Sequence, residues 1–275
     1  MKTFLRRPGN KSNHLRHIVP LLPKGFETYI EPFIGTGALF LHLLPGKWII
    51  NDLNTDIIGI WKLVRDNPTF LIKEINTFKK SFLHLNNEEK LLKCQHIAKK
   101  LSDNVYQMGK RYAMYLILVY CSFNGSLEKD NTLEISSLYT NIYNNKSCHL
   151  FTDTYKNKLL ELSKMLKNGT IYNKDYKTIL KKAKKGDFVF LDPPYIEERT
   201  YAFNYNTHEK LFDIIELKNE LEKLDKLGVK WMMTQICSPD ILNLFSKYRK
   251  VKYVNSLCFA KSSTPKTELI IMNYP

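Results

Sequence analysis

The sequence lacks the cysteine pattern of a disulfide-rich or zinc-binding protein. Its 5 cysteines are widely spread and include no closely spaced pair, so neither a disulfide framework nor a structural zinc site is indicated. We therefore expect a reducing, intracellular setting and no metal cofactor.

Long apolar segments are missing as well. The longest apolar run, residues 112–123, is too short to span a bilayer and predicts a buried helix. Residues 1–11 alternate basic and small residues without an apolar stretch, so we expect no signal peptide. The chain is thus expected to be neither secreted nor embedded in a membrane.

Negative charge is scarce relative to positive charge. Lys and Arg number 42 and Asp and Glu 27, which leaves a formal charge of +15. A surplus of this size favours a polyanionic partner, most often nucleic acid, although an anionic membrane surface would also serve. The 275 residues, 44% of them hydrophobic, are typical of a folded protein with one large domain or a core domain plus a smaller module.

Strand and helix patterns alternate at both ends of the chain, which predicts an α/β fold with a doubly wound, Rossmann-like sheet. Strands are expected at residues 28–33, 47–52, 169–173, 187–191 and 229–234, with a closing antiparallel pair at 252–259 and 269–273. Helices are expected at residues 38–44, 56–64, 176–185 and 211–227.

The middle of the chain has a different character. Residues 69–110 are rich in Lys, Glu and Leu at helical spacing, and residues 124–157 are polar. We predict an inserted, mainly helical module at residues 67–157, within a core domain built from residues 1–66 and 158–275.

The first motif that indicates ligand binding is a glycine turn after the first strand. Gly35 and Gly37 allow close approach of a ligand to the backbone, and Asp52 follows at the end of the next strand, where a carboxylate can bind ribose hydroxyls. Phe40 replaces the third glycine of a dinucleotide fingerprint, which argues against a bound pyrophosphate. A plain strand-to-helix turn with a solvated Asp52 stays an open reading of these residues.

The second motif, Asp192-Pro-Pro-Tyr195, is more specific. It follows an apolar strand, so it lies at the carboxyl end of the sheet, where open α/β folds bind ligands. The acid, a proline carbonyl and the aromatic ring offer two hydrogen-bond acceptors and a stacking face, which are what the exocyclic amine of a planar base requires.

These motifs resemble those of the adenine-specific DNA methyltransferases of the Dam type, the D12 class. The likeness rests on Glu31-Pro-Phe-Ile-Gly-Thr-Gly-Ala-Leu-Phe40, on Asp192-Pro-Pro-Tyr195 and on their order along the chain. The resemblance implies an S-adenosylmethionine-dependent methyltransferase sheet, with residues 67–157 as the target-recognition domain, and double-stranded DNA as partner. The resemblance is also compatible with two further partners, a second copy of the chain in a homodimer and a cognate restriction endonuclease.

The resemblance also implies roles for individual residues. The catalytic residues would be Asp192, Pro193, Pro194 and Tyr195. The cofactor would be held by Arg7, Lys11, Glu31, Pro32, Phe33, Gly35, Gly37, Asp52, Asp175, Tyr176 and Asp192. DNA would be contacted by Lys110, Arg111, Asn124, Gly125, Lys129, Phe203 and Tyr205.

The reaction implied is transfer of a methyl group to the N6 amine of an adenine flipped out of the duplex. Asp192 and the Pro193 carbonyl would accept the amine hydrogens, and Tyr195 would stack on the base. Three alternatives stay open at this point. They are methylation of another exocyclic amine (cytosine N4 in DNA or adenine in RNA), a catalytically silent nucleic-acid-binding protein, and a nicotinamide-dependent oxidoreductase, which Phe40 disfavours.

Overall fold

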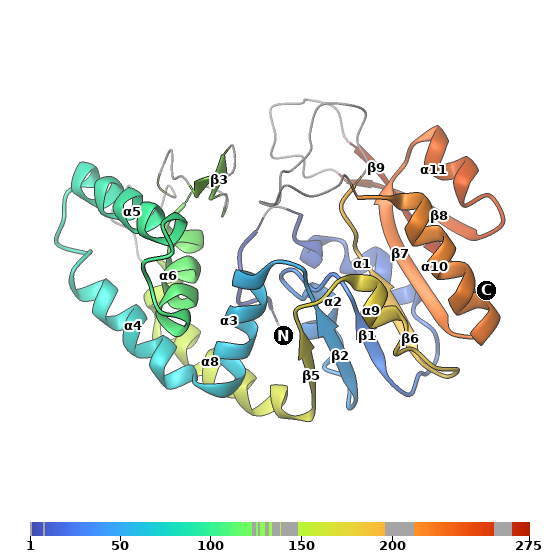
Figure 1. The fold of residues 1–275 in the computed structure, drawn as a ribbon, viewed down its shortest axis with the longest axis horizontal. Coiled ribbons are helices and arrows are strands. Elements are labelled where there is room, and N and C mark those ends of the chain that lie inside the picture. The colour runs from blue at the N-terminus through green and yellow to red at the C-terminus, as the bar shows by residue number, and fades with distance from the viewer. Residues whose placement is uncertain are drawn as a thin grey trace.

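A seven-stranded sheet forms the centre of the protein (Figure 1), which a computed structural model describes over residues 2–7, 9–122, 125, 127–129, 132–133, 138, 148–195, 212–255 and 266–275. The strand order is β5-β2-β1-β6-β7-β9-β8. Within this sheet β9 runs antiparallel between β7 and β8, and the other six strands share one direction. The strands are β1 (Tyr29–Glu31), β2 (Trp48–Asn51), β5 (Gly169–Tyr172), β6 (Phe188–Leu191), β7 (Lys230–Ile236), β8 (Arg249–Asn255) and β9 (Lys266–Met272).

The predicted α/β fold and its closing antiparallel pair are confirmed. Alternate residues of the strands enter two different apolar cores, which explains why these strands read as continuous hydrophobic runs. Phe188 and Phe190 of β6 face one core, whereas Val189 and Leu191 face the other. Because both faces of such strands are buried, the polar residues that bind ligands lie in the loops at the strand ends.

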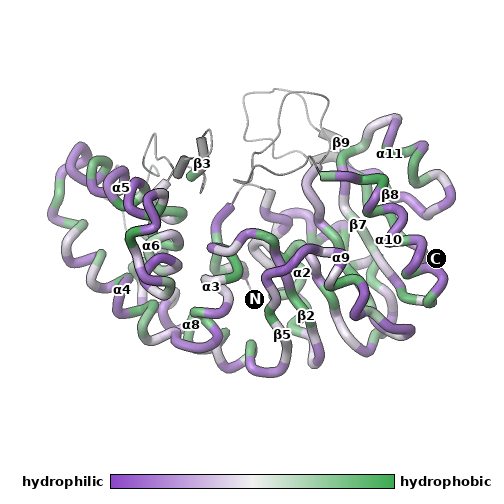
Figure 2. The backbone as a smooth tube through the Cα atoms, viewed as in Figure 1, coloured by the Kyte–Doolittle hydropathy of each residue, from purple (hydrophilic) through white to green (hydrophobic). Residues whose placement is uncertain are grey.

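Helices cover both faces of the sheet. Three of them pack on the face that carries Val189: α9 (Tyr176–Leu180), α10 (Ile214–Leu227) and α11 (Pro239–Leu244). The opposite face is covered by α2 (Ala38–Leu43), α3 (Thr55–Asp66) and the N-terminal segment, whose short helices are η1 (Lys11–Asn13), α1 (Leu15–Ile18) and η2 (Val19–Leu21). Figure 2 shows hydrophilic stretches alternating with hydrophobic ones along α10, the pattern of a helix with one face on a core.

Helix α9 is shorter than the predicted helix at residues 176–185. It ends at Leu180, and the chain turns twice before β6 begins at Phe188. The Asp187 carboxylate accepts the Lys184 N–H at 2.9 Å and closes the second turn. A local side-chain acceptor therefore competes with helix continuation, as short acidic residues often do.

A group of helices extends the structure beyond the β5 edge of the sheet (Figure 1). They are α4 (Pro68–Lys80), α5 (Asn87–Ser102), α6 (Met108–Cys121) and α8 (Asp153–Met165), with η4 (His149–Phe151) and η5 (Leu166–Asn168) at the two ends of α8. A separate two-stranded pair, β3 (Glu128–Lys129) and β4 (Thr132–Leu133), lies near α5.

The boundaries of these helices follow from local capping residues. Asn67 caps α4 by accepting the Phe70 N–H at 3.1 Å, and Pro68 occupies the first helical position. Asn86 and Glu89 form a reciprocal capping box at the start of α5.

The division into a core domain and an inserted module stays a proposal. The helices of residues 67–157 share one continuous apolar core with the sheet, and the expected boundary at residue 157 falls within α8. Helix α6 carries that core from one region to the other, because Ala113 to Cys121 are all buried.

The glycine turn between β1 and α2 is held by Trp61 of α3. The Trp61 ring is fully buried, and its Nε1–H donates to the Gly35 carbonyl at 3.1 Å. Gly37 has φ +65°, and a Cβ at that position would lie 2.6 Å from the Trp61 ring. Glycine is therefore required at residue 37 both by the backbone conformation and by packing.

Gly37→Ala should lower the free energy of unfolding by ~2–4 kcal/mol, since it adds a left-handed backbone penalty to overpacking against Trp61. Gly46→Ala is the matched control, because a Cβ there meets no atom within 4 Å and the backbone is not left-handed. Denaturant unfolding measures both. Equal, small effects of the two substitutions would contradict this account of the turn.

Candidate active site

The strand order reverses direction at β1, whose neighbours are β2 on one side and β6 on the other. The carboxyl ends of β1 and β6 therefore flank the crevice where doubly wound sheets bind ligands. The glycine turn follows β1, and Asp192-Pro-Pro-Tyr195 follows β6. The two predicted motifs, far apart in the sequence, thus meet at one end of the sheet.

Asp52 lies at the end of β2 and anchors the glycine turn. Its Oδ2 accepts the Gly35 N–H and its Oδ1 accepts the Asn54 N–H, both at 2.9 Å. Burial raises the pKa of the Asp52 carboxyl, against the opposing effects of the Arg7 charge and of these backbone donors. A carboxylate can accept about four hydrogen bonds in all, so a further hydroxyl donor still fits beside these backbone donors.

The loops after β1, β2 and β5 are tied together by two asparagines. The buried Asn51 side chain donates to the carbonyls of Pro32 and Lys174 and accepts the Lys174 N–H. Asn173 donates from Nδ2 to the carbonyls of Asp52 and Leu53. These hydrogen bonds tie the loops after β1, β2 and β5 to one another. We call these three linked loops the rim.

Three aromatic rings gather on this rim. Phe33 lies 5.3 Å from Tyr176 and 5.8 Å from Phe212, measured between ring centroids, and Tyr176 lies 5.7 Å from Phe212. The Tyr176 hydroxyl is buried and has no hydrogen-bond partner in the part of the chain that the structure describes. Burial and nearby acidic side chains raise the pKa of Tyr176. A planar ligand with a polar edge suits such a cluster.

Two predicted cofactor residues have contacts within the protein: Glu31 is buried, whereas Asp175 is exposed. Glu31 is 2% exposed, and its Oε2 accepts the Tyr29 hydroxyl at 2.6 Å. Burial raises the pKa of Glu31 well above its usual value, and the charges of Asp192 and Asp52 add to that effect. Asp175 caps α9 by accepting the Lys177 N–H at 2.8 Å. Cofactor contacts of Glu31 and Asp175 stay predictions.

Lys11 and Thr234 hold the Asp192 carboxylate through its Oδ1 oxygen. Its Oδ1 lies 3.0 Å from Lys11 Nζ and accepts the Thr234 hydroxyl at 2.6 Å. Among the described residues, no hydrogen bond reaches Oδ2. Pro193 is buried, Pro194 is exposed, and the Pro194 carbonyl lies 3.5 Å from Gln235 Nε2.

Lys11 connects the N-terminal segment to this motif. Its side chain is 9% exposed, and its ammonium lies 4.6 Å from the centroid of the Tyr195 ring as well as beside Asp192. A buried ammonium needs such partners, because an unpaired charge is costly away from water. The predicted cofactor residue Lys11 therefore contacts the motif expected to be catalytic.

The Tyr195 ring is held at its far end by Glu268 of β9. The Tyr195 hydroxyl donates to Glu268 Oε2 at 2.7 Å, and the Tyr253 hydroxyl donates to the same oxygen at 2.6 Å. His14 Nδ1 lies 3.3 Å from that oxygen. Burial acts to raise the pKa of Glu268, but the bonds from His14 and Tyr253 and the Lys11 charge outweigh it and lower the pKa to about 2.

Four of these side chains were not among the predicted site residues: Thr234, Glu268, His14 and Tyr253. Glu268 carries the clearest sequence signal, because it is an acidic residue directly before the apolar run at residues 269–272. The partners of such an acid cannot be read from the run itself.

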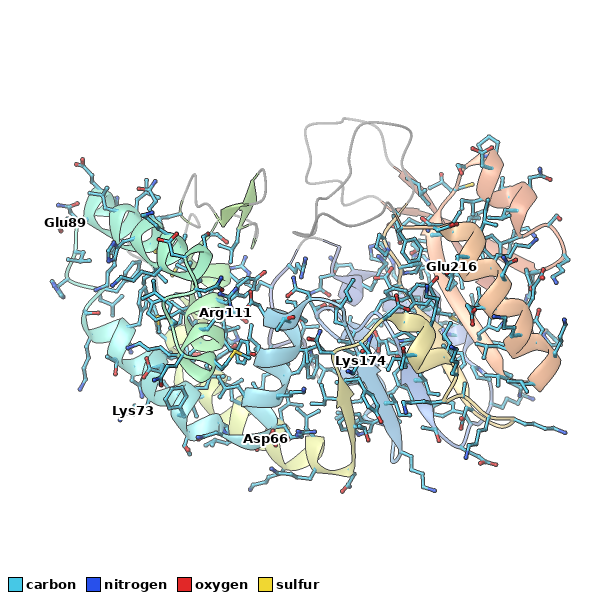
Figure 3. All side chains as sticks on the ribbon, in the orientation of Figure 1. Asp66, Lys73, Glu89, Arg111, Lys174 and Glu216 are labelled. Atoms are coloured by element: carbon cyan, nitrogen blue, oxygen red, sulfur yellow. The ribbon has the colours of Figure 1, made fainter. Side chains whose placement is uncertain are left out.

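The predicted DNA-binding residues have varied settings. The Arg111 guanidinium pairs with both Asp56 oxygens, at 2.6 and 2.8 Å, and also donates to Leu101 and Asn104. Figure 3 labels Arg111 on α6, next to α3. Four of its N–H donors are thus used to join helices, and its contact with DNA stays a prediction.

Lys110 is exposed at the start of α6. Gly125 is buried, and a Cβ there would lie 3.0 Å from the Arg6 carbonyl. Lys129 belongs to β3. Asn124, Phe203 and Tyr205 lie outside the described residues.

The described residues also bear on metal binding and on membrane insertion. No group of three or more potential metal ligands occurs among them. None of their helices combines the length and apolarity needed to cross a membrane.

Comparison with known proteins connects this geometry to one family. A family model described as D12 class N6 adenine-specific DNA methyltransferase matches residues 8–257. The Type II methyltransferase M1.LlaDCHI of Lactococcus lactis subsp. cremoris is 29% identical, over 100% of this chain and 96% of that protein. The Type II methyltransferase M.MjaIII of Methanocaldococcus jannaschii is 29% identical, over 100% and 99%. The DNA N-6-adenine-methyltransferase of Escherichia phage P1 is 26% identical, over 89% of this chain and 31% of that protein.

The lowered pKa of Glu268 generates a prediction about stability. Its folded pKa of about 2 lies below the ~4.3 of an unfolded Glu, so the carboxylate stabilises the fold above pH ~4.3 and loses that effect as pH falls toward 2. The difference in unfolding free energy between the wild type and Glu268→Gln should therefore shrink by ~1–2 kcal/mol from pH 6 to pH 3. Denaturant unfolding at both pH values measures it. A difference independent of pH would show that Glu268 is not held as a stabilised anion.

Proposed function

The chain belongs to the D12 class of N6 adenine-specific DNA methyltransferases, and from this premise we propose how its residues carry out the reaction. The family assigns adenine N6 in DNA as the target, which sets aside cytosine N4, adenine in RNA and nicotinamide chemistry. We propose S-adenosylmethionine as the methyl donor and a flipped-out adenine as the acceptor. The observation that carries the proposal is the Asp192 carboxylate: Lys11 and Thr234 hold its Oδ1, and no hydrogen bond from the described residues reaches Oδ2.

The rim formed by the loops after β1, β2 and β5 fits the proposed cofactor. Asp52 offers carboxylate lone pairs to the ribose hydroxyls, and the aromatic rings of Phe33, Tyr176 and Phe212 offer faces to the adenine ring. The position next to Gly35 is open, since a Cβ there would meet no atom within 4 Å. The Tyr176 hydroxyl, which has no hydrogen-bond partner among the described residues, is a further polar group of this aromatic cluster. When bound, S-adenosylmethionine supplies a methyl group on a positively charged sulfur.

Asp192 and Pro193 act on the amine of the target base. That nitrogen is a weak nucleophile, because its lone pair is delocalised into the ring. We propose that Asp192 Oδ2 and the Pro193 carbonyl accept its two hydrogens, which turns the lone pair toward the methyl group. On methylation the amine would lose one of its two protons, for which Asp192 Oδ2, already its proposed hydrogen-bond acceptor, would be the nearest base. Lys11 and Thr234 keep Oδ1 occupied, so the carboxylate presents Oδ2.

Tyr195 supplies the stacking face for the extruded base, which has lost its neighbours in the duplex. Phe203 and Tyr205 stay predicted contacts for the other face. Residues 67–157 stay the proposed target-recognition domain, with the exposed Lys110 as a candidate for phosphate contact.

Three further parts of the proposal rest on relatives or on the substrate. Two relatives carry the name type II methyltransferase, which supports a cognate restriction endonuclease as a functional partner. A homodimer stays a proposal of the same kind. A DNA substrate supports action inside the cell.

Asp52→Ala should weaken S-adenosylmethionine binding by ~1.5–3 kcal/mol, the scale of hydrogen bonds to a charged group. Isothermal calorimetry measures the affinity. Asp240→Ala on α11 is the control, since that acid is exposed and lies after β7, which is three strand positions from β2 in the sheet. Unchanged affinity in a folded Asp52→Ala protein would refute the ribose contact.

Asp192→Asn should reduce methyl transfer ~10²-fold or more, because an NH₂ group replaces an acceptor and the charge is lost. DNA binding should persist, since phosphate contacts lie elsewhere. Thr234→Val is the matched variant: it keeps the carboxylate, removes one anchor of Oδ1 and should have a smaller effect. Transfer of a labelled methyl group to DNA measures all three proteins. Near wild-type turnover of Asp192→Asn would overturn the proposed role of this site.

A further inference from the structure

One oxygen of Glu268 gathers three polar groups from distant parts of the chain. Glu268 is 4% exposed, and its Oε2 accepts the hydroxyls of Tyr195 and Tyr253 and lies near His14 Nδ1. His14 Nδ1 is also 2.9 Å from the Tyr253 hydroxyl oxygen. Because that hydroxyl donates to Glu268, its oxygen is left to accept from His14, which places the proton on Nδ1.

This cluster restrains Tyr195 from the side opposite to Asp192. Residues 192–195 have no regular secondary structure, so the backbone alone does not fix the ring. The bond to Glu268 fixes the hydroxyl end, and the Lys11 ammonium over the ring restricts rotation about the long axis. Since Lys11 also pairs with Asp192, the ring and the carboxylate are held relative to each other.

We propose that Glu268 is a positioning residue for methyl transfer. It acts through the Tyr195 hydroxyl and sets the plane on which the flipped adenine stacks, so that the amine reaches Asp192. His14 and Tyr253 support it by occupying the same oxygen. The proposal rests on the proposed function of Asp192 and Tyr195 and adds a residue that touches neither the base nor the cofactor.

A second cluster around a carboxylate, the half-buried Asp225, provides a built-in control. Asp225 accepts hydrogen bonds from the Tyr248 hydroxyl at 2.6 Å and from Trp231 Nε1 at 2.8 Å. It belongs to the C-terminal turn of α10 and contacts Trp231 at the amino end of β7, whereas Thr234 lies in the second half of that strand. A role confined to stability should therefore affect Asp225→Asn and Glu268→Gln alike, whereas a positioning role affects Glu268→Gln alone.

The test is a double-mutant cycle with Glu268→Gln, Tyr195→Phe and the two combined. Single-turnover transfer of a labelled methyl group is measured at saturating DNA, on a short duplex whose methylated adenine has been mapped. Because small misplacements of reacting groups slow chemistry strongly, we expect each single variant to be slower by ~10- to 100-fold. The double variant should be no slower than the slower single variant. DNA affinity should be unchanged, and Asp225→Asn should keep the wild-type rate.

A fluorescence measurement gives a second readout. With 2-aminopurine in place of the target adenine, fluorescence rises on extrusion and is quenched by stacking on Tyr195. Glu268→Gln should give a brighter complex than the wild type, and Asp225→Asn should not.

Independent, multiplying effects of Glu268→Gln and Tyr195→Phe would overturn the proposal, as would equal slowing by Asp225→Asn. If Glu268→Gln does not fold, Tyr195→Phe alone decides, because it deletes only the hydroxyl and leaves Glu268 with Tyr253 and His14. A wild-type rate for Tyr195→Phe then refutes the positioning role. Failure of the wild type to methylate adenine would instead refute the proposed function.

Discussion

The ion pair between Lys11 and Asp192 is the contact on which the rest of the site depends. It joins the N-terminal segment to the end of β6, and the buried ammonium has the carboxylate as its ionic partner. Thr234 adds a bond from β7 to the same oxygen. A carboxylate restrained in this way has one defined direction for its remaining oxygen, which is the property that activation of an amine by orientation requires.

The order of the strands explains why these residues meet. The reversal at β1 sends the loops after β1 and β6 to opposite sides, which is where doubly wound sheets bind ligands. Single polar side chains, above all Asn51 and Asp52, link the loops after β1, β2 and β5. Trp61 supports the same turn from the other face, through the Gly35 carbonyl. The aromatic rim and the Asp192 motif are therefore two parts of one rigid edge of the sheet, which suits a reaction between two bound molecules.

Much of the fold follows from local patterns in the sequence. The apolar run at residues 187–191 and the glycines at 35 and 37 predict a buried strand and a tight turn, and both are observed. Phe40, which breaks the dinucleotide fingerprint, packs against Trp48 and Trp61 in the core. Its bulk is thus a core requirement of this sheet.

The partners of the site residues could not be predicted in the same way. Lys11 and Asp192 are joined only by tertiary folding, as are Glu268 and His14, and no local period records such pairs. Arg111 shows a second limit of prediction from sequence. A basic residue in a basic chain suggests a phosphate contact, but the Arg111 guanidinium joins α6 to α3. Charge predicts the class of partner, whereas burial and pairing decide which charges are available to it.

The central claim, that Asp192 presents Oδ2 to the target amine while Lys11 holds Oδ1, is tested most directly by a crystal structure with duplex DNA and a non-reactive analogue of S-adenosylmethionine. The account predicts an extruded adenine stacked on Tyr195, its N6 within hydrogen-bonding distance of Oδ2 and the Pro193 carbonyl, and Lys11 still paired with Oδ1. An amine that displaces Lys11 from Oδ1, or a base that binds away from Tyr195, would contradict it.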